Sequence, residues 1–161
     1  MAITGTDNYF DDFKVGAVYE HARGRTVTEM DNVLLTLMVM NTAQGHFNEE
    51  SMADTKFRKR IVFGGLTAAM VIGLASQDTA ENAIAELTLD KVRFTSPVFH
   101  GDTLHAYTEV LDTWLDDTRA DAGVVKFRHY GVNQRDQMVF EGERTVLIRR
   151  RLVTVETPRH E

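Results

Sequence analysis

The feature that most constrains the fold of this chain is a helical segment that is apolar on nearly every side. Residues 64–77 read Gly-Gly-Leu-Thr-Ala-Ala-Met-Val-Ile-Gly-Leu-Ala-Ser-Gln, and Thr67 is the only polar side chain before Ser76. A helix without a polar face is normally buried. The remainder of the chain is therefore expected to wrap around this helix.

Four strand-like segments follow the helix and can provide that wrapping. After Asn82 the spacing of apolar residues changes, and we predict strands at residues 84–94, 103–113, 123–133 and 137–150. Ser-Pro, Gly-Asp and Asp-Asp pairs mark the turns between them. Long antiparallel strands joined by short turns can cover their apolar face with one helix. The predicted fold class is α+β, a single curved antiparallel sheet wrapped round a central buried helix.

The N-terminal half is expected to add an edge strand and a helix. Two glycines bracket a short edge strand at residues 17–23. Thr28 is placed to cap a helix that runs from Glu29 to near Asn41, and Asp31 completes an approximate capping box. This helix carries a broad apolar face at helical spacing, formed by Val33, Leu34, Leu37, Met38 and Met40.

A polar segment lies between the two helices. Residues 47–60 predict a short helix and a loop, with Met52 and Phe57 as the side chains that anchor it to the core. The whole domain is predicted to span residues 1–153. The polar residues 154–161 are predicted to form a frayed tail.

Composition and charge exclude several classes of function. The formal net charge of −6 argues against a general affinity for nucleic acid or anionic membranes. The chain has no cysteine and its six histidines lack the close spacing of ligands, so no metal site is predicted. No signal peptide is visible, and the longest near-apolar run, residues 33–40, is too short to cross a bilayer. We therefore expect a cytoplasmic protein.

One histidine and one pair of glycines carry the candidate chemistry. His46 lies five positions after Asn41, and Gly64 and Gly65 follow His46 by 18 and 19 positions at the start of the apolar helix. A histidine that faces backbone N–H groups at a helix start supplies both a base and an oxyanion site. This arrangement suits chemistry on a carbonyl group, and on a thioester in particular.

These features together resemble the MaoC-like family of (R)-specific enoyl-CoA hydratases, which have the hot-dog fold. The likeness covers nearly the whole chain, from residues 10–16 through residues 94–98 to the last strand. In that family the signature Asp-x-Asn-Pro-x-His is followed by a His-Gly pair that opens the central helix. His46 matches the signature histidine and Gly64 the signature glycine, without a gap. One subgroup of the family hydrates mesaconyl-CoA- or itaconyl-CoA-type substrates. The chain resembles this subgroup in residues 25–32 and in residues 40–44, which read Met-Asn-Thr-Ala-Gln.

Four positions depart from the family signature. Asn41 replaces the catalytic aspartate, and Phe63 replaces the second histidine. Ala43 and Gln44 replace the asparagine and the proline. An amide does not exchange a proton at neutral pH, although it can hold a water molecule by hydrogen bonds. Asn41 is thus expected either to contact the reacting water or the substrate, or only to end its helix.

The resemblance implies reversible addition of water across the double bond of an α,β-unsaturated acyl-CoA. In this scheme the Gly64 N–H polarises the thioester carbonyl, His46 is the base toward water, and Phe63 and Gly65 line the substrate site. The glycine pair has an alternative role in the close packing of helix against sheet. No cofactor is implied beyond the CoA of the substrate, and the implied assembly is a homodimer or a trimer of dimers.

Basic residues are candidates for binding the anionic parts of an acyl-CoA. Arg58, Lys59 and Arg60 form a cluster that can attract the CoA phosphates, or else a solvated turn. Arg25 and Arg93 are candidates for contacting a second carboxylate on the substrate, which is expected to be branched and dicarboxylic. Two rival functions stay open, an acyl-CoA thioesterase and a non-catalytic acyl-CoA-binding protein.

Overall fold

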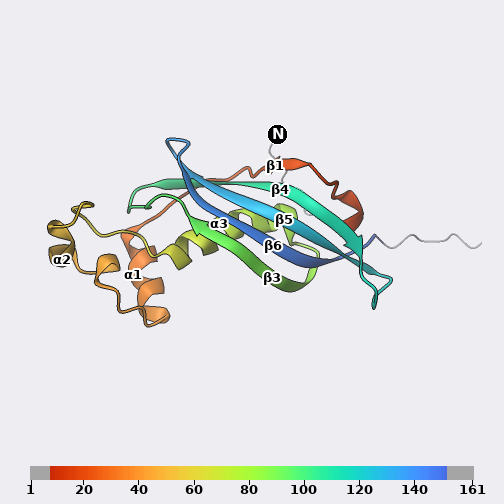
Figure 1. Cartoon of the computed structure of the whole chain (residues 1–161), viewed down its shortest axis with the longest axis horizontal. Helices are drawn as coiled ribbons and strands as arrows, with labels where there is room; N and C mark the ends of the chain where they lie inside the picture. Colours follow the sequence, from red (N-terminus) through yellow and green to blue (C-terminus); the bar gives the residue numbers. More distant parts are fainter. Residues whose placement is uncertain (1–7, 152–161) are drawn as a thin grey trace, which may run out of the picture.

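The computed structural model of the protein describes residues 8–151, which form one antiparallel sheet with helices along one face and beyond one end (Figure 1). Five strands lie side by side in the order β1 (Val18–Glu20), β4 (Thr103–Leu115), β5 (Ala122–Asn133), β6 (Met138–Arg149) and β3 (Ala83–Phe94). The short strand β2 (Arg25–Thr26) also pairs with β4. Each of these pairings is antiparallel, so the predicted α+β layout is confirmed.

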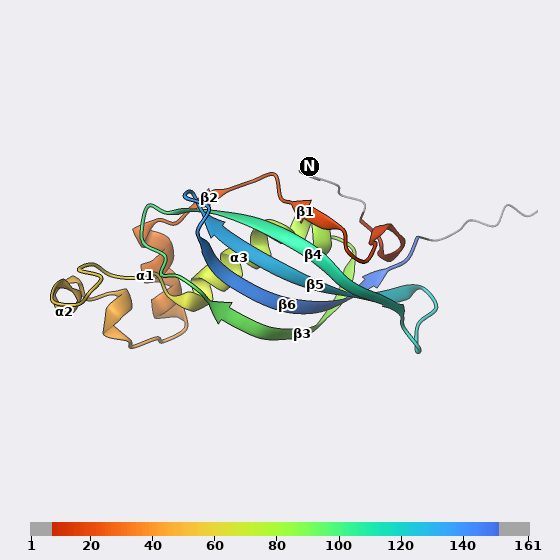
Figure 2. The same ribbon diagram turned by 45° about the horizontal axis from the view of Figure 1, so that its top comes forward.

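The helix α3 (Gly64–Thr79) lies along one face of the sheet, as predicted (Figures 1 and 2). The helix and the sheet share one apolar cluster, formed by Val27, Val62, Leu66, Met70, Val71, Val98, Leu104, Ala106, Val139 and Phe140. A second cluster joins the segment after the turn η1 (Phe10–Asp12) to the sheet, where the rings of Phe13 and Phe127 meet edge to face. Ala69 and Gly73 of α3 are exposed, so the expected burial on nearly every side is incomplete.

The remaining helical segments form a lobe beyond one end of the sheet (Figure 2). They are α1 (Glu29–Met38), the 3₁₀ turn η2 (Gln44–His46) and α2 (Glu49–Ala53). The predicted capping box is confirmed, because the Thr28 hydroxyl accepts from Asp31 N and the Asp31 carboxylate accepts from Thr28 N. This pair fixes the start of α1 at the position that the sequence indicated.

The two predicted anchors of the polar segment are placed as expected. Met52 of α2 is buried, and the half-buried ring of Phe57 packs against the ring of Phe99 with 6.2 Å between the ring centres. The contact between Phe57 and Phe99 attaches the α2 end of the lobe to the loop that precedes β4. The lobe is therefore a packed unit, although it extends past the sheet.

Much of the apolar face of α1 is exposed. Leu34, Leu37 and Met38 are 51%, 68% and 78% exposed, whereas the buried side chains of the helix are the polar residues Asn32 and Thr36. The reason is that α1 lies at the end of the sheet, where its inner side meets backbone groups of neighbouring turns. Polar side chains satisfy those groups and apolar ones cannot.

The limits of the other elements agree closely with the predictions. Each of the four long strands begins and ends within two residues of its predicted limits. The edge strand β1 is shorter than the predicted segment 17–23, and β2 was not predicted. The predicted tail 154–161 lies outside the described residues. No helix within residues 8–151 is both long and apolar enough to span a membrane.

Four polar side chains form a hydrogen-bonded chain through the core. The ring of His21 contacts an Asp78 carboxylate oxygen at 2.6 Å and Thr108 Oγ1 at 2.7 Å, and Thr108 Oγ1 lies 2.7 Å from His129 Nδ1. None of the four residues is more than 4% exposed. Burial, with the nearby Arg144 guanidinium, lowers the pKa of His129 to about 3, so this ring is neutral near pH 7.

The neutral His129 predicts a loss of stability as the pH falls below about 6.5. The unfolded chain takes up a proton on this histidine near pH ~6.5, whereas the folded chain does so only near pH 3. The free energy of unfolding should therefore fall by up to ~1.4 kcal/mol per pH unit between these values. Urea unfolding should show a smaller pH slope for His129→Asn, which cannot titrate, than for the parent chain. Equal slopes would show that His129 does not cause the pH dependence of the free energy of unfolding.

Candidate active site

The candidate site lies where the lobe meets the first turn of α3 (Figure 2). The turn η2 presents His46, and residues 61–63 lead into the helix that begins at Gly64. The ring of His46 is half-buried, and its centre is 5.5 Å from that of the Phe63 ring. The structure thus places the ring of His46 beside the ring of Phe63, the residue directly before Gly64.

The hydrogen bond of the His46 ring identifies the nitrogen that carries its proton. Nδ1 lies 3.0 Å from the carbonyl oxygen of Ile61, and a carbonyl can only accept a hydrogen bond. In the neutral ring the proton is therefore on Nδ1, and Nε2 keeps its lone pair. An imidazole held in this form can accept a proton from a water molecule at Nε2.

The first turn of α3 leaves backbone N–H groups available. The N–H groups of Leu66 and Thr67 donate to the carbonyl oxygen of Phe63, at 2.9 and 3.2 Å. The N–H groups of Gly64 and Gly65 make no hydrogen bond within residues 8–151. Unpaired N–H groups at a helix start, together with the helix dipole, favour an oxygen that carries negative charge.

Both glycines also allow close packing of aromatic rings against the start of α3. A Cβ atom on Gly64 would lie 3.1–3.3 Å from carbons of the Phe94 ring, and one on Gly65 would lie 2.5 Å from the Phe63 ring. The alternative packing role of the glycine pair is therefore real. It is compatible with an oxyanion role, because the N–H groups of both glycines make no hydrogen bond within the part of the chain that the structure describes.

Asn41 does not end the helix. The residue in the left-handed conformation after α1 is Met40, with φ of 53°. The Asn41 side chain instead accepts a hydrogen bond from Ala43 N at 2.9 Å and so shapes the turn that leads to His46. It also lines a mostly apolar hollow of about 380 Å³, together with Leu37, Met40 and Phe47. Its amide Nδ2 makes no hydrogen bond within the described part of the chain, which leaves a donor for water.

The basic cluster 58–60 does not act as one group. Arg60 is held by the carboxylates of Glu29 and Glu49, which makes it part of the lobe structure. Lys59 Nζ lies 4.2 Å above the ring of Phe99, and Arg58 is exposed. Of the three predicted phosphate-binding residues, Arg60 is therefore already neutralised by the chain itself.

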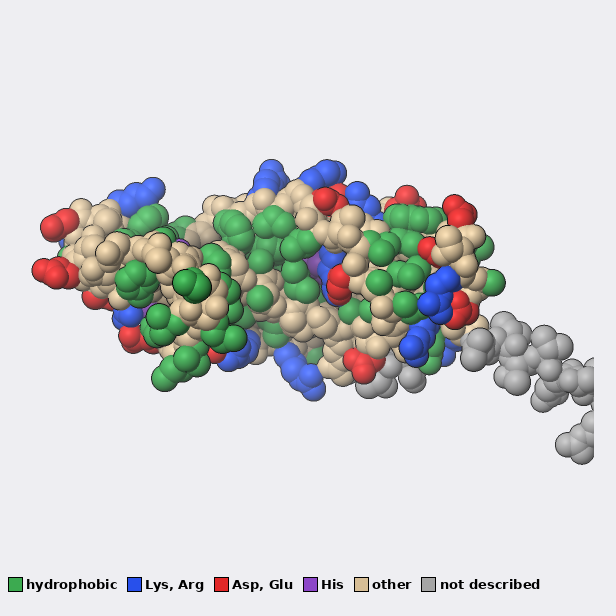
Figure 3. Space-filling model, turned by 90° about the horizontal axis from the view of Figure 1, so that it is seen from below, with side chains coloured by type: hydrophobic (Ala, Val, Ile, Leu, Met, Phe, Trp, Pro, Cys, Tyr) green, Lys and Arg blue, Asp and Glu red, His purple; other side chains and the backbone are tan. Residues whose placement is uncertain are grey.

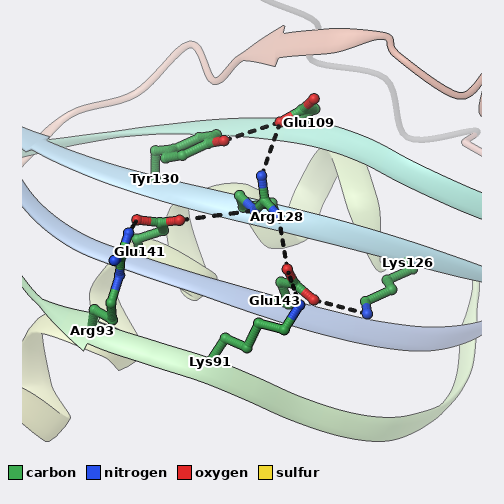
Figure 4. Close-up of polar contacts among 8 residues, drawn as sticks. All are labelled: Lys91, Arg93, Glu109, Lys126, Arg128, Tyr130, Glu141 and Glu143. Atoms are coloured by element: carbon green, nitrogen blue, oxygen red, sulfur yellow. Dashed lines mark hydrogen bonds and ion pairs between the residues drawn. The ribbon is translucent and has the colours of Figure 1, made fainter.

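Arg93 lies on the face of the sheet that is turned away from α3 (Figure 4). It forms an ion pair with Glu141 inside a network that spans β3, β4, β5 and β6. At the centre of the network, hydrogen bonds from Arg128 and then Lys126 lower the pKa of the buried Glu143 carboxyl to about 2. The structure therefore does not bring Arg93 to the site of His46 and Gly64.

Arg25 lies on the helix side of the sheet. It lines a groove of about 420 Å³ that follows α3, together with Leu66 and Met70. Its guanidinium also forms an ion pair with Asp31 at 2.7 Å. Of the two arginines predicted for a substrate carboxylate, Arg25 is thus the one that shares a groove with the first turn of α3.

A further residue, which the sequence reasoning missed, is Asn32. Its side chain contacts both the His46 turn and the start of α3. An asparagine inside a helix, followed one turn later by Thr36, was the available signal, because both residue types have low helix propensity.

Within residues 8–151 no group of three or more His, Asp or Glu side chains could hold a metal ion.

The fold and this site together define a MaoC-like protein with the hot-dog fold. A solved structure assigned as a MaoC domain dehydratase, from Chloroflexus aurantiacus, matches with a TM-score of 0.85 and 28% identity, over 92% of this chain and 46% of that chain. A Mycobacterium tuberculosis protein described as a double hot-dog fold matches with a TM-score of 0.81 and 23% identity, over 94% of this chain and 46% of its own. The predicted hot-dog fold is confirmed.

The family can be stated more narrowly. The sequence model of mesaconyl-CoA hydratase matches residues 3–150. The mesaconyl-CoA hydratase of Haloarcula marismortui is 32% identical, over 92% of this chain and 44% of that protein. The chain therefore belongs to the mesaconyl-CoA hydratase family, in agreement with the predicted subgroup. It spans less than half the length of this curated relative.

Proposed function

We propose that this protein is a hydro-lyase that adds water reversibly to an α,β-unsaturated acyl-CoA, of the branched dicarboxylic mesaconyl-CoA or itaconyl-CoA type. The observation that carries the proposal is the pairing of His46 with the open start of α3. The His46 ring is fixed with its proton on Nδ1, and the Gly64 N–H makes no hydrogen bond among the described residues. A base and an oxyanion donor are the two groups that this reaction needs.

The geometry supports a mechanism in two connected steps. The Gly64 N–H binds the thioester oxygen and withdraws electrons from the double bond, which makes the β-carbon electrophilic. The water oxygen then bonds to the β-carbon as His46 Nε2 accepts one water proton. His46 returns that proton to the α-carbon, so that atoms and charge balance without another acid. Asn41 orients the water through its free amide donor, and no cofactor enters beyond the CoA of the substrate.

The second carboxylate of the substrate is proposed to meet Arg25. This arginine shares its groove with Leu66, which is only two residues beyond Gly64, or ~3 Å along the helix axis. A short branched acyl group whose thioester oxygen lies at Gly64 is proposed to extend along this groove toward Arg25. The name of the Haloarcula relative, mesaconyl-CoA hydratase, supports the same substrate class. Arg58 and Lys59 are the proposed contacts for the CoA phosphates, since Arg60 is held by two carboxylates and its side chain is only 15% exposed. Arg25 is paired with Asp31, but its side chain is 55% exposed.

Exposed apolar surface supports an assembly with a second copy of the chain. Hydrophobic side chains gather at the end of the molecule that carries α1 and along the middle of the same face (Figure 3). Those on α1 and on the turns after it are Met30, Leu34, Leu37, Met38, Val39, Met40 and Phe47.

The edge strand β3, paired with β6 alone among the described strands, exposes Leu87, Leu89 and Phe94. An edge strand can pair with its own copy across a two-fold axis, so a homodimer is proposed. A trimer of dimers and a cytoplasmic location stay predictions.

Measuring enoyl absorbance and free thiol in the same reaction tests the proposed function. With crotonyl-CoA or mesaconyl-CoA, the purified protein should remove the enoyl absorbance without releasing thiol. Release of thiol would instead identify an acyl-CoA thioesterase. Saturable binding with neither change would identify a non-catalytic acyl-CoA-binding protein.

A further inference from the structure

The side chain of Asn32 connects the two halves of the candidate site. Its Nδ2 donates to the carbonyl oxygen of His46 at 2.8 Å, and its Oδ1 accepts from the N–H of Phe63 at 2.9 Å. Residue 46 is 14 positions from Asn32 along the chain, and residue 63 is 31 positions away. One amide therefore bonds both to the residue that carries the base and to the residue directly before the oxyanion donor.

Asn32 is an unusual residue for its position. It is inside α1 and 0% exposed, whereas asparagine is a poor helix former and a buried amide is unfavourable unless it is hydrogen-bonded. Here the amide NH₂ donates to a carbonyl, which can only accept, and the amide oxygen accepts from a backbone N–H, which can only donate. Asparagine can serve both at once, whereas aspartate lacks the donor and an aliphatic side chain lacks both groups.

Two more hydrogen bonds join the same segments and show that the turn and the helix start are held as one unit. The His46 ring donates from Nδ1 to the Ile61 carbonyl, and the Ile61 N–H donates to the Gly45 carbonyl at 3.0 Å. These bonds hold the ring and the turn. The bonds of Asn32 hold the backbone of His46 against the backbone of Phe63, which sets how far the ring is from the first N–H of α3.

We propose that Asn32 is a positioning residue that sets the separation between His46 Nε2 and the Gly64 N–H. This inference rests on the proposed hydratase function. Asn32 does not touch the substrate, because its side chain is fully buried and both ends are occupied. Its effect is to keep the base and the oxyanion donor at the distance that suits attack on the β-carbon. A displacement of about 1 Å in such a pair can reduce the rate about 10²-fold.

The test compares Asn32→Asp with the matched control Thr36→Val. Asn32→Asp keeps an acceptor for Phe63 N but loses the donor to His46. Thr36 is buried on the same side of α1 one turn later, and among the described residues its hydroxyl bonds to the Asn32 carbonyl oxygen of its own helix alone. We expect Asn32→Asp to reduce kcat about 10- to 100-fold with KM changed less than about threefold, and Thr36→Val to keep kcat within about twofold. Circular dichroism and urea unfolding of each variant establish that it is folded.

Asn32→Ser is the second variant, for the case in which a buried aspartate prevents folding. Its short hydroxyl cannot span both partners, so the same loss of kcat at nearly constant KM is expected. Unchanged kcat in a folded Asn32 variant, an equal loss in Thr36→Val, or failure of both Asn32 variants to fold would overturn the positioning role. An inactive parent chain would overturn the proposed function and this inference together. An active parent with a fully active Asn32→Asp would overturn this inference alone.

Discussion

Replacement of His46 by alanine should slow hydration about 10²–10⁴-fold and leave the fold intact, because the ring is proposed as the base toward water. The ring is only half-buried, so its removal leaves a small defect at the edge of the lobe. The bond to the Ile61 carbonyl is lost with it, and that loss alone could shift the turn. Steady-state kcat measured from the decrease in enoyl absorbance checks the expected value.

His46→Asn separates the loss of the base from the loss of this bond. An asparagine amide can still donate to the Ile61 carbonyl from a position close to that of Nδ1, but it has no group in place of Nε2. The value of kcat should therefore fall by a similar factor in His46→Ala and in His46→Asn. If His46→Asn keeps more than about a tenth of the parent rate, the imidazole is not the base.

Removal of the Gly64 N–H should reduce kcat about 10²–10³-fold, the loss usually found for one oxyanion donor. Gly64→Pro removes this N–H directly, and proline is well tolerated at the first position of a helix. The backbone of Phe63, with φ of −58° and ψ of 129°, is already in the extended conformation that precedes proline. The helix should therefore form normally in the variant.

Gly64→Ala is the matched control, because its Cβ atom meets the same Phe94 ring while the N–H is kept. The ratio of kcat between the alanine and proline variants isolates the contribution of the donor. A ratio near one, with both variants folded, would show that the Gly64 N–H does not bind the thioester oxygen.

Much of the fold could be predicted from the sequence because the relevant signals are local. The alternation of apolar residues determines where the four long strands begin and end, and the capping box of Thr28 and Asp31 determines where α1 begins. The position of His46 relative to Gly64 could be predicted only through the family signature. The spacing by itself does not show that the intervening lobe folds back on α3.

The errors concern the surroundings of side chains, which depend on residues distant in sequence. The apolar stripe of α1 indicated a helix correctly, but helical spacing does not show which side of the helix is covered. The pairing of Arg60 with Glu29, 31 positions away, and of Arg93 with Glu141, 48 positions away, depends on the tertiary structure. Asn32 was missed for the same reason, since both partners of its amide are backbone groups of other segments.

The most direct measurement is kcat/KM of the purified protein for mesaconyl-CoA compared with crotonyl-CoA, from the loss of enoyl absorbance. A charge-assisted contact between Arg25 and the second carboxylate is worth roughly 1.5–3 kcal/mol. We therefore predict that mesaconyl-CoA is preferred about ten- to a hundred-fold. Equal values, or a preference for crotonyl-CoA, would contradict the dicarboxylate specificity, and no loss of absorbance with either thioester would contradict hydration itself.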